Sequence, residues 1–233
     1  IAAGTLTGDE TLTVNGITID SRTPGAGPDM LFIALRGPNH DGHKFIEPLY
    51  HRGIKLFLVD TLPSNHGDMA GAGFVRVDNT LEALHRLAGW RRDSFRGKVI
   101  AVTGSAGKTI VKEWLAGLLS TARSVIRSPR SYNSQVGVAL SLMNLDDRYD
   151  VAVIEAGISK PGEMEKLARI IRPDTVIITN IGDAHGENFA GREAIAAEKL
   201  KLTAGAGLVI CCADDQIIMN EMASYYPSVP LFT

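Results

Sequence analysis

In the second half of the chain, short apolar runs alternate with segments of helical periodicity. The strand candidates are Val99–Val102, Ser124–Arg127, Val151–Glu155, Thr175–Asn180 and Leu208–Cys212. Helical patterns lie between several of them, as over residues 162–171, where Met164, Leu167, Ala168 and Ile171 share one face. This alternation predicts an α/β fold with a mostly parallel sheet and helices on both faces.

The first part of the chain has shorter apolar runs, separated by turns rich in glycine and proline. Strands are expected over Leu12–Ile19, Met30–Leu35, Leu56–Val59 and Phe74–Val77, and helices over Phe45–Arg52 and Thr80–Arg92. This texture predicts a small α/β domain over residues 1–95. The polar segment 91–97 is the expected boundary to a second domain over residues 96–233.

One segment of the second domain has the pattern of a phosphate-binding loop. A buried strand, Val99–Val102, leads into Gly104-Ser-Ala-Gly-Lys-Thr109, which opens a helix. Backbone N–H groups and the helix N-terminus attract phosphate, a lysine reaches the terminal phosphates, and a threonine hydroxyl binds Mg²⁺. The spacing between the glycines is shorter than in the strict P-loop, so a variant loop is required. The alternative is an ordinary strand-to-helix turn.

The residues after this loop predict an amphipathic helix on the sheet. Ile110, Trp114 and Leu118 recur four residues apart. Val111, Leu115 and Leu119 form a second such row. We expect these two rows to pack against the strands.

Several polar residues follow other strands and are candidates for chemistry. In an open parallel sheet, ligands bind beyond the carboxyl ends of the strands, where Glu155, Asn180 and His185 are expected. Glu155 is a candidate Mg²⁺ ligand, or else an ion-pair or capping residue. Asn133 is a candidate phosphate or substrate contact, or part of a plain turn. Lys199, in a helical segment, is by itself indistinguishable from a solvated lysine.

Composition excludes several classes of partner. The chain has 24 basic and 26 acidic residues and a formal net charge of −2, which indicates neither nucleic acid nor a membrane surface as partner. It contains no apolar run long enough to span a bilayer. Cys211 and Cys212 are adjacent, so a disulfide between them is not expected, and a reducing cytoplasm fits.

Together these segments resemble the Mur ligase family of ATP-dependent ligases. Val102-Thr-Gly-Ser-Ala-Gly-Lys-Thr109 resembles the family's shortened phosphate loop, and Tyr132-Asn-Ser-Gln-Val-Gly137 resembles its asparagine loop. Ile154-Glu-Ala-Gly157 resembles its metal-glutamate segment, and Thr179-Asn-Ile-Gly-Asp-Ala-His185 resembles a specific block of the family. Ile195-Ala-Ala-Glu-Lys199 falls where the family carries a carbamylated lysine.

The resemblance implies ATP and Mg²⁺ as cofactors and assigns roles to individual residues. The implied catalytic residues are Lys108, His185 and Lys199. The implied ATP-binding residues are Gly104, Ser105, Ala106, Gly107, Lys108, Thr109, Asn133 and Asn180. Thr109 and Glu155 would hold one metal ion, and His185 and carbamylated Lys199 a second.

The N-terminal region resembles the domain with which such ligases hold a UDP-linked substrate. The implied contacts are Asp20, Ser21, Arg22, Asp41, Gly42 and His43. These residues could equally build turns. Within the family, the whole pattern is most similar to the type that joins D-alanyl-D-alanine to UDP-N-acetylmuramoyl-tripeptide by way of an acyl phosphate.

Two further expectations follow from the resemblance. Family members are longer and end in a third domain, so we expect this chain to be a fragment that lacks that domain and does not complete catalysis alone. Ala106, Ser134 and Ala156 depart from common family residues, and the pattern around them resembles the form fused to a C-terminal alanine racemase. The alternatives are a non-catalytic UDP-sugar or nucleotide-binding module, and a related ligase that adds a single amino acid.

Overall fold

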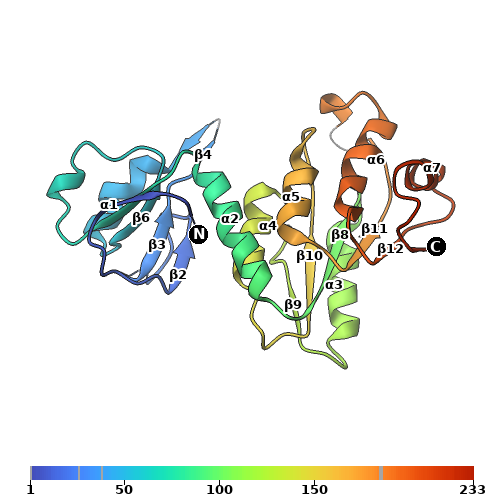
Figure 1. The fold of residues 1–233 in the computed structure, drawn as a ribbon, viewed down its shortest axis with the longest axis horizontal. Helices are drawn as coiled ribbons and strands as arrows, with labels where there is room; N and C mark the ends of the chain where they lie inside the picture. The colour runs from blue at the N-terminus through green and yellow to red at the C-terminus, as the bar shows by residue number, and fades with distance from the viewer. Residues whose placement is uncertain (1, 26, 38, 184–185) are drawn as a thin grey trace. The chain divides into compact units, whose positions relative to one another are not determined.

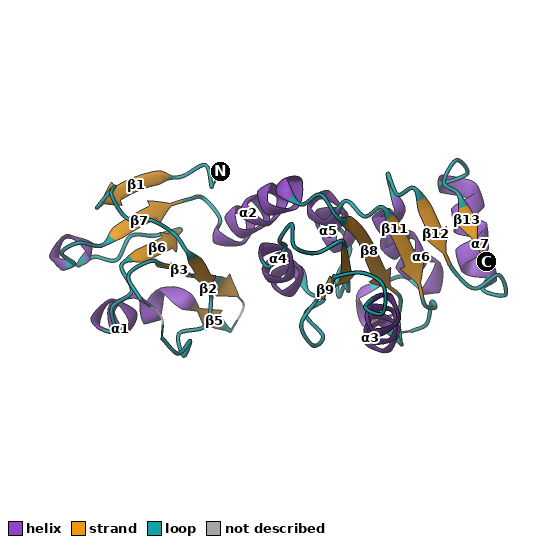
Figure 2. Ribbon diagram, turned by 90° about the horizontal axis from the view of Figure 1, so that it is seen from below, coloured by secondary structure: helices purple, strands orange, loops and turns teal. Residues whose placement is uncertain are grey.

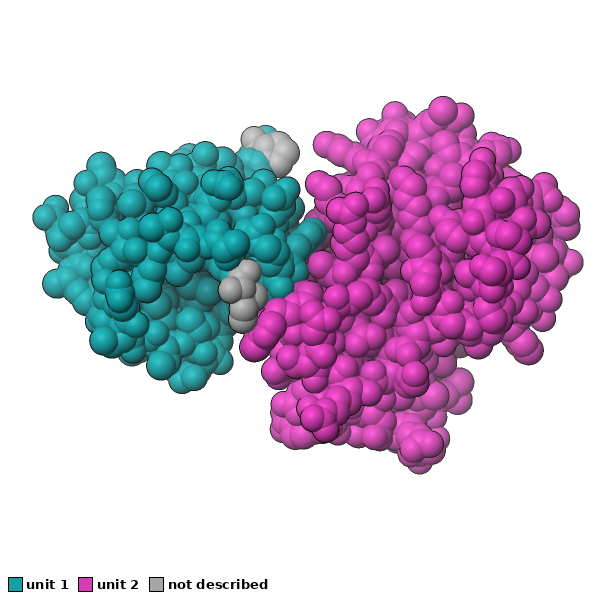
Figure 3. Space-filling view, viewed as in Figure 1, with its two compact units in different colours: residues 1–87 teal, residues 88–233 magenta. Residues whose placement is uncertain are grey.

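The chain forms two compact units, residues 1–87 and 88–233 (Figure 3). The computed structural model describes residues 2–25, 27–37, 39–183 and 186–233. The units divide within helix α2 (Thr80–Ser94), a few residues before the polar segment that we expected as a boundary. Each unit has a sheet of its own (Figure 1).

A five-stranded sheet lies at the centre of the first unit, in the order β1-β7-β6-β3-β2. β1 pairs with β7 antiparallel, and the other neighbours pair in parallel. The strands are β1 (Thr5–Gly8), β2 (Gly16–Thr18), β3 (Met30–Ile33), β6 (Leu56–Val59) and β7 (Gly73–Arg76).

The edges of this sheet differ from the sequence prediction. The strand expected over Leu12–Ile19 is wrong for its first half. There Asn15 bonds to Asp29 through both backbone and side chain, and pairing with β3 starts at Gly16. β1 was not predicted, because its residues are largely exposed and lack an apolar alternation.

Three phenylalanines in contact lie in the core of the first unit: Phe57 stacks on Phe74 and meets Phe32 edge to face. Phe57 lies between Phe32 and Phe74, with ring centroids at 6.5 and 5.3 Å, and all three are buried. Around them lie β4 (Arg36–Gly37), β5 (His40–Asp41), the 3₁₀ turns η1 (Gly42–Phe45) and η2 (His66–Asp68), and α1 (Ile46–His51). The helix expected over Phe45–Arg52 is therefore one residue shorter at each end.

The second unit is built on a six-stranded parallel sheet, in the order β13-β12-β11-β8-β10-β9. The strands are β8 (Lys98–Thr103), β9 (Val125–Arg127), β10 (Val151–Glu155), β11 (Thr175–Ile178), β12 (Leu208–Ile210) and β13 (Leu231–Phe232). The predicted parallel sheet is thus confirmed. The short, exposed β13 was not predicted. Because β8 lies between β10 and β11, their carboxyl ends lie next to one another.

Helices cover both faces of this sheet, as predicted; Figure 2 shows α3 on one side and α5 on the other. The helices of this unit that follow β8 are α3 (Lys108–Leu119), α4 (Gln135–Met143), α5 (Glu163–Ile171), α6 (Arg192–Leu200) and α7 (Gln216–Tyr225), with the 3₁₀ turns η3 (Gly186–Asn188) and η4 (Lys201–Thr203). None of the helices in the described ranges combines the length and apolarity needed to cross a bilayer. Cys211 and Cys212 are both free thiols.

Only one of the two apolar rows of α3 packs on the sheet. Val111, Leu115 and Leu119 contact the core around Val102 and Val153. Ile110, Trp114 and Leu118 are instead 58%, 73% and 72% exposed, so the expectation that they pack on the strands is wrong. Successive residues of a helix lie about 100° apart, so when the row of Val111 faces the sheet directly, the row of Ile110 is turned about 100° away from it.

Asp174, just before β11, joins three segments of the second unit. Its carboxylate accepts hydrogen bonds from Lys98 Nζ at 2.7 Å and from the backbone N–H of Val99 at 2.9 Å, and lies 3.6 Å from Arg92 Nη2. Burial alone would raise the pKa of Asp174. The hydrogen bonds and the two cations outweigh burial, so the pKa is lowered.

We predict that Asp174→Asn destabilises the second unit in a pH-dependent way. Since the folded pKa lies below the unfolded one, the carboxylate's contribution is present above the unfolded pKa and is lost as pH falls through the folded pKa. At neutral pH we expect a loss of about 1–2 kcal/mol of unfolding free energy, measured by urea denaturation, shrinking toward zero in acid. Asp214→Asn, at an exposed aspartate, is the control. A loss of the same size at every pH would contradict the assignment.

Candidate functional site

The loop between β8 and α3 takes the shape that its two glycines permit. Gly104 has a φ of +141°, and a Cβ there would overlap the Thr179 hydroxyl. Gly107, with a φ of +78°, is the N-cap of α3, which begins at Lys108. The first N–H groups of a helix have no partner within it, so those of Lys108 and Thr109 are available to an anion at this end of the sheet.

The segment after β11 holds this loop in place. Asn180 accepts from the backbone N–H of Ser105 through its carbonyl (2.9 Å), and from that of Ala106 through its side-chain oxygen (2.9 Å). Thr179 donates its hydroxyl to the Ala106 carbonyl at 2.5 Å. The Asn180 side chain is therefore hydrogen-bonded to the backbone of the loop. Two of the loop's N–H groups are engaged within the protein.

Two lysines converge on one carbonyl of the loop. Lys108 Nζ lies 2.8 Å from the Gly104 oxygen, and Lys199 Nζ, from α6, lies 3.1 Å from the same oxygen. Lys199 is only 1% exposed. Burial, and secondarily the charge of Lys108, lower the pKa of Lys199 to about 8. Burial also lowers the pKa of Lys108, with Glu155 acting in the opposite direction.

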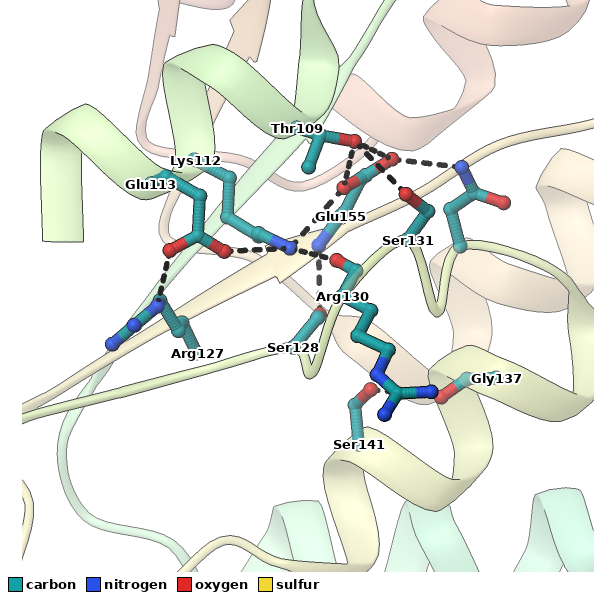
Figure 4. A network of polar contacts seen from close by, with 11 residues as sticks. Thr109, Lys112, Glu113, Arg127, Ser128, Arg130, Ser131, Gly137, Ser141 and Glu155 are labelled. Carbon is teal, nitrogen blue, oxygen red and sulfur yellow. Dashed lines mark hydrogen bonds and ion pairs between the residues drawn. The ribbon is translucent and has the colours of Figure 1, made fainter.

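Glu155, at the end of β10, is fully buried and hydrogen-bonded. The Thr109 hydroxyl lies 3.1 and 2.9 Å from its two oxygens (Figure 4). Asn133 Nδ2 lies 2.7 Å from Oε1. Thus the two strand ends flanking Gly104, those of β10 and β11, both contribute to the site. The predicted proximity of Thr109 and Glu155 is present.

The donor set of Thr109 and Glu155 fits Mg²⁺. One hydroxyl and one carboxylate offer only oxygen ligands, and Mg²⁺ in nucleotide sites is commonly held by one or two such groups plus phosphate oxygens and water. Within the described ranges, no three His, Cys, Asp or Glu side chains group as a cage. One carboxylate and one hydroxyl suit a cation that takes its other ligands from a nucleotide and water. His185, the other proposed metal ligand, lies outside the described residues.

In the first unit, a hollow of about 520 Å³ is lined by three residues of the predicted substrate set, Asp20, Ser21 and Arg22, together with Ile19, His40 and Phe45. Asp20 forms a two-pronged pair with Arg22, at 2.9 Å from both Nε and Nη2. This pairing lowers the pKa of Asp20 to about 2. Arg52 donates to the carbonyls of Ser21 and Thr23, which anchors the loop.

Asp41, Gly42 and His43 support this region without lining the hollow. Both ring nitrogens of His43 are engaged: Nδ1 lies 2.7 Å from Asp41 and Nε2 lies 3.2 Å from Asp60. Gly42 is buried, and a Cβ there would press on Ala34 and the Leu35 backbone. These residues therefore brace the β4–β5 hairpin.

Sequence reasoning missed several residues of both regions. In the first unit they are His40, stacked on Phe45 at 5.7 Å, together with Asp60 and Arg52. In the second unit they are Thr179 as a clamp on the loop, and Lys112, which contacts Glu155. Of these residues, only Thr179 could have been found from the sequence, because it begins the segment 179–185 that resembles a specific block of the family.

Comparison with known families identifies both units. The model of the Mur ligase middle domain matches residues 102–229, and that of the "Mur ligase family, catalytic domain" matches residues 13–92. The chain belongs to the Mur ligase family. The match over residues 102–229 falls within the second unit, whereas the match over residues 13–92 covers most of the first unit and extends into the start of the second.

Among relatives of this Mur ligase chain, the UDP-N-acetylmuramoyl-tripeptide–D-alanyl-D-alanine ligase of Bacillus subtilis is 33% identical over 91% of the chain and 46% of the relative. A MurF structure from Acinetobacter baumannii has a TM-score of 0.85 at 29% identity, over 94% of this chain and 47% of that one. MurF from Thermotoga maritima in complex with ADP has a TM-score of 0.81 at 29% identity, over 96% and 50%. The chain thus spans half the length of these relatives, or slightly less.

We predict that Gly104→Ala and Gly107→Ala have unequal effects. Both glycines have positive φ, which costs an L-residue about 1–2 kcal/mol. Only at Gly104 does the added Cβ also overlap Thr179, so that the loop must move. Urea denaturation should show a larger loss for Gly104→Ala, with weakened nucleotide binding by calorimetry. Equal losses in the two variants would contradict this reading of the loop.

We also predict a pH-dependent contribution from Lys199. Its folded pKa of about 8 lies below the ordinary 10.5, so the fold favours the neutral amine. The stability that the neutral amine contributes is therefore present above pH 10.5 and is lost as pH falls through 8. In CO₂-free buffer, the unfolding free energy of the wild type relative to Lys199→Met should rise by about 2 kcal/mol between pH 7 and pH 10.

Lys201→Met is the matched control for that measurement. The Lys201 side chain is 40% exposed and pairs with Glu198, which raises its pKa, so it stays charged in both states over the same pH range. Wild type and Lys201→Met should therefore differ by a constant amount. If the difference in unfolding free energy between wild type and Lys199→Met were also independent of pH, the Lys199 amine would have an ordinary pKa and the prediction would be wrong.

Proposed function

We propose that this chain is part of an ATP-dependent ligase that joins D-alanyl-D-alanine to UDP-N-acetylmuramoyl-tripeptide. Under this proposal, residues 1–95 bind the UDP-linked substrate and residues 96–233 bind ATP. Relatives over nearly the whole chain that carry this name support the proposal, as does a similar structure solved with ADP. Cytoplasmic action on small-molecule substrates is part of the same proposal.

The observation that carries the proposal is that a lysine, a helix N-terminus, a hydroxyl and a buried carboxylate lie together at three adjacent strand ends. Lys108 and the N-terminus of α3 supply positive charge, and Thr109 and Glu155 supply oxygen ligands. Lys199 reaches the same loop from a different helix. An isolated strand-to-helix turn would need neither a buried glutamate nor a buried lysine.

The proposed reaction has two steps. In the first, an oxygen of the substrate carboxylate attacks the γ-phosphorus of ATP, the bond to the β-phosphate oxygen breaks, and an acyl phosphate and ADP result. In the second, the amine of the dipeptide attacks the acyl carbon, phosphate leaves with the electron pair of the broken C–O bond, and the nitrogen loses a proton.

In this reaction the chain's own residues bind and orient the phosphates. Lys108 would exchange its contacts with the Gly104 and Ser105 carbonyls for phosphate oxygens, where its charge opposes the negative charge that gathers in the transition state. Asn180 keeps the loop backbone in register through Ser105 and Ala106. Bound Mg²⁺, held by Thr109 and Glu155, would supply further neutralisation of the phosphate oxygens.

Lys199 is proposed to bind a second cation as a carbamate. Its neutral amine would attack CO₂, forming an N–C bond and releasing one proton, which turns a cation into an anionic oxygen ligand. With a pKa of about 8, roughly a tenth of the amine is neutral at pH 7. His185 is the proposed partner ligand.

In the first unit, the UDP group is proposed to bind in the hollow beside Asp20, Ser21 and Arg22. Asp41, Gly42 and His43 are proposed to act on that group through the hairpin that they brace. A fused C-terminal alanine racemase stays a prediction, and the length of the intact gene product tests it.

The test is a ligation assay on the intact gene product with ATP, Mg²⁺, UDP-N-acetylmuramoyl-tripeptide and D-alanyl-D-alanine. We predict that Lys108→Ala lowers kcat/KM at least about 100-fold while unfolding like the wild type, because a cation aimed at the phosphates is lost. Lys166→Ala, at an exposed lysine of α5, is the control and should retain activity.

The outcomes of this assay separate the alternatives. Turnover by Lys108→Ala would refute the phosphate assignment. Nucleotide or UDP binding by the wild type without ligation would favour a non-catalytic binding module. Ligation of a single amino acid in place of the dipeptide would favour a different type of Mur ligase.

A further inference from the structure

Lys112 is a fully buried lysine that the proposed reaction does not use. It lies one turn after Thr109 on α3 and is 0% exposed. Its ammonium meets three acceptors: the carbonyl of Arg130, Glu113 Oε1 at 3.2 Å and Glu155 Oε2 at 3.4 Å (Figure 4). An ammonium has three N–H donors, so these acceptors can satisfy it in full.

The two carboxylates around Lys112 have different surroundings. The Glu113 side chain is 40% exposed, and Arg127 Nε lies 2.6 Å from its other oxygen, so Glu113 already has a cation of its own. The side chain of Glu155 is 1% exposed, and Lys112 is its ion-pair partner among the described residues. A buried charge needs such a partner, so Lys112 compensates Glu155 in particular.

Lys112 also ties down the segment that follows β9. Arg130 has a left-handed φ of +47°, which a residue other than glycine rarely adopts, and its carbonyl points to the Lys112 ammonium. Three residues further on, Asn133 donates to Glu155. Ser128, in the same segment, accepts from the Glu155 backbone N–H at 3.0 Å. One ammonium thus joins α3, the end of β10 and residues 128–133.

We propose that Lys112 is a positioning residue for the nucleotide-bound divalent cation. It holds the Glu155 carboxylate beside the Thr109 hydroxyl and fixes the segment that brings Asn133 to the same carboxylate. The inference rests on the proposed function, since it assigns Thr109 and Glu155 to that cation. Lys112 itself touches neither nucleotide nor metal; it acts through Glu155 and the Arg130 carbonyl.

The test compares nucleotide binding with and without Mg²⁺ in the intact gene product. Calorimetry gives the Kd of ADP in excess Mg²⁺ and in EDTA for the wild type, Lys112→Met and Lys112→Gln. We expect both variants to lose at least about tenfold in affinity with Mg²⁺, and to stay within about twofold of the wild type in EDTA. A role in folding alone would change both values together or neither.

Two control variants and a second substitution sharpen the result. Lys112→Gln keeps an N–H donor for the Arg130 carbonyl and is expected to fold even where Lys112→Met does not. Glu113→Gln leaves the Lys112–Glu155 contact in place and should keep the Mg²⁺ response. Lys98→Met removes a lysine that is 76% exposed and pairs with Asp174, and should also keep it.

Four outcomes would overturn the inference. They are an unchanged Mg²⁺ response in a folded Lys112 variant, tighter Mg²⁺-dependent binding, equal losses with and without Mg²⁺, and unfolding of both Lys112 variants. Tighter binding would mean that Lys112 only competes with the cation for Glu155. Absence of any Mg²⁺-dependent binding by the wild type would contradict the proposed function as well, which separates the two failures.

Discussion

Parallel pairing of β8 with β10 on one side and β11 on the other is the constraint on which the second unit depends. The registers Val102 to Glu155 and Thr103 to Ile178 align the carboxyl ends of the three strands. Among the described residues of the candidate site, Glu155 ends β10, Asn180 follows β11, and Thr109 follows β8, so the three lie at the same end of the sheet. The loop at Gly104 has its shape because Thr179 and Asn180 follow β11, and Glu155 meets Thr109 because β10 ends beside β8.

This arrangement brings several charges into the interior. Glu155, Lys112 and Lys199 are all nearly inaccessible to water, and each has polar partners. Removal of one member of a buried pair typically costs more than removal of both, because the remaining charge stays desolvated. The buried charges of the site are therefore stabilised by polar groups from other helices and strands. Helix α3 provides two of these groups, Thr109 and, one turn later, Lys112.

The sequence predicted the strands of the second unit well, since buried parallel strands are continuous apolar runs. It could not tell which apolar row of α3 faces the sheet, because the rows through Trp114 and Leu115 have the same period. Lys112 was missed for a related reason: a lysine on a helix reads as solvated until the neighbouring strand and loop are placed. The roles of Asn180 and His43 in bracing backbone depend on contacts between segments far apart in the chain.

The exposed row on α3 has an optical consequence. Trp90 and Trp114 are the chain's two tryptophans, and they are 46% and 73% exposed. An indole already in water changes its emission little when the chain unfolds. Intrinsic tryptophan fluorescence from residues 1–233 is thus a poor reporter of core melting, whereas backbone circular dichroism follows the sheets directly. The same two indoles are accessible to aqueous quenchers while the fold is intact.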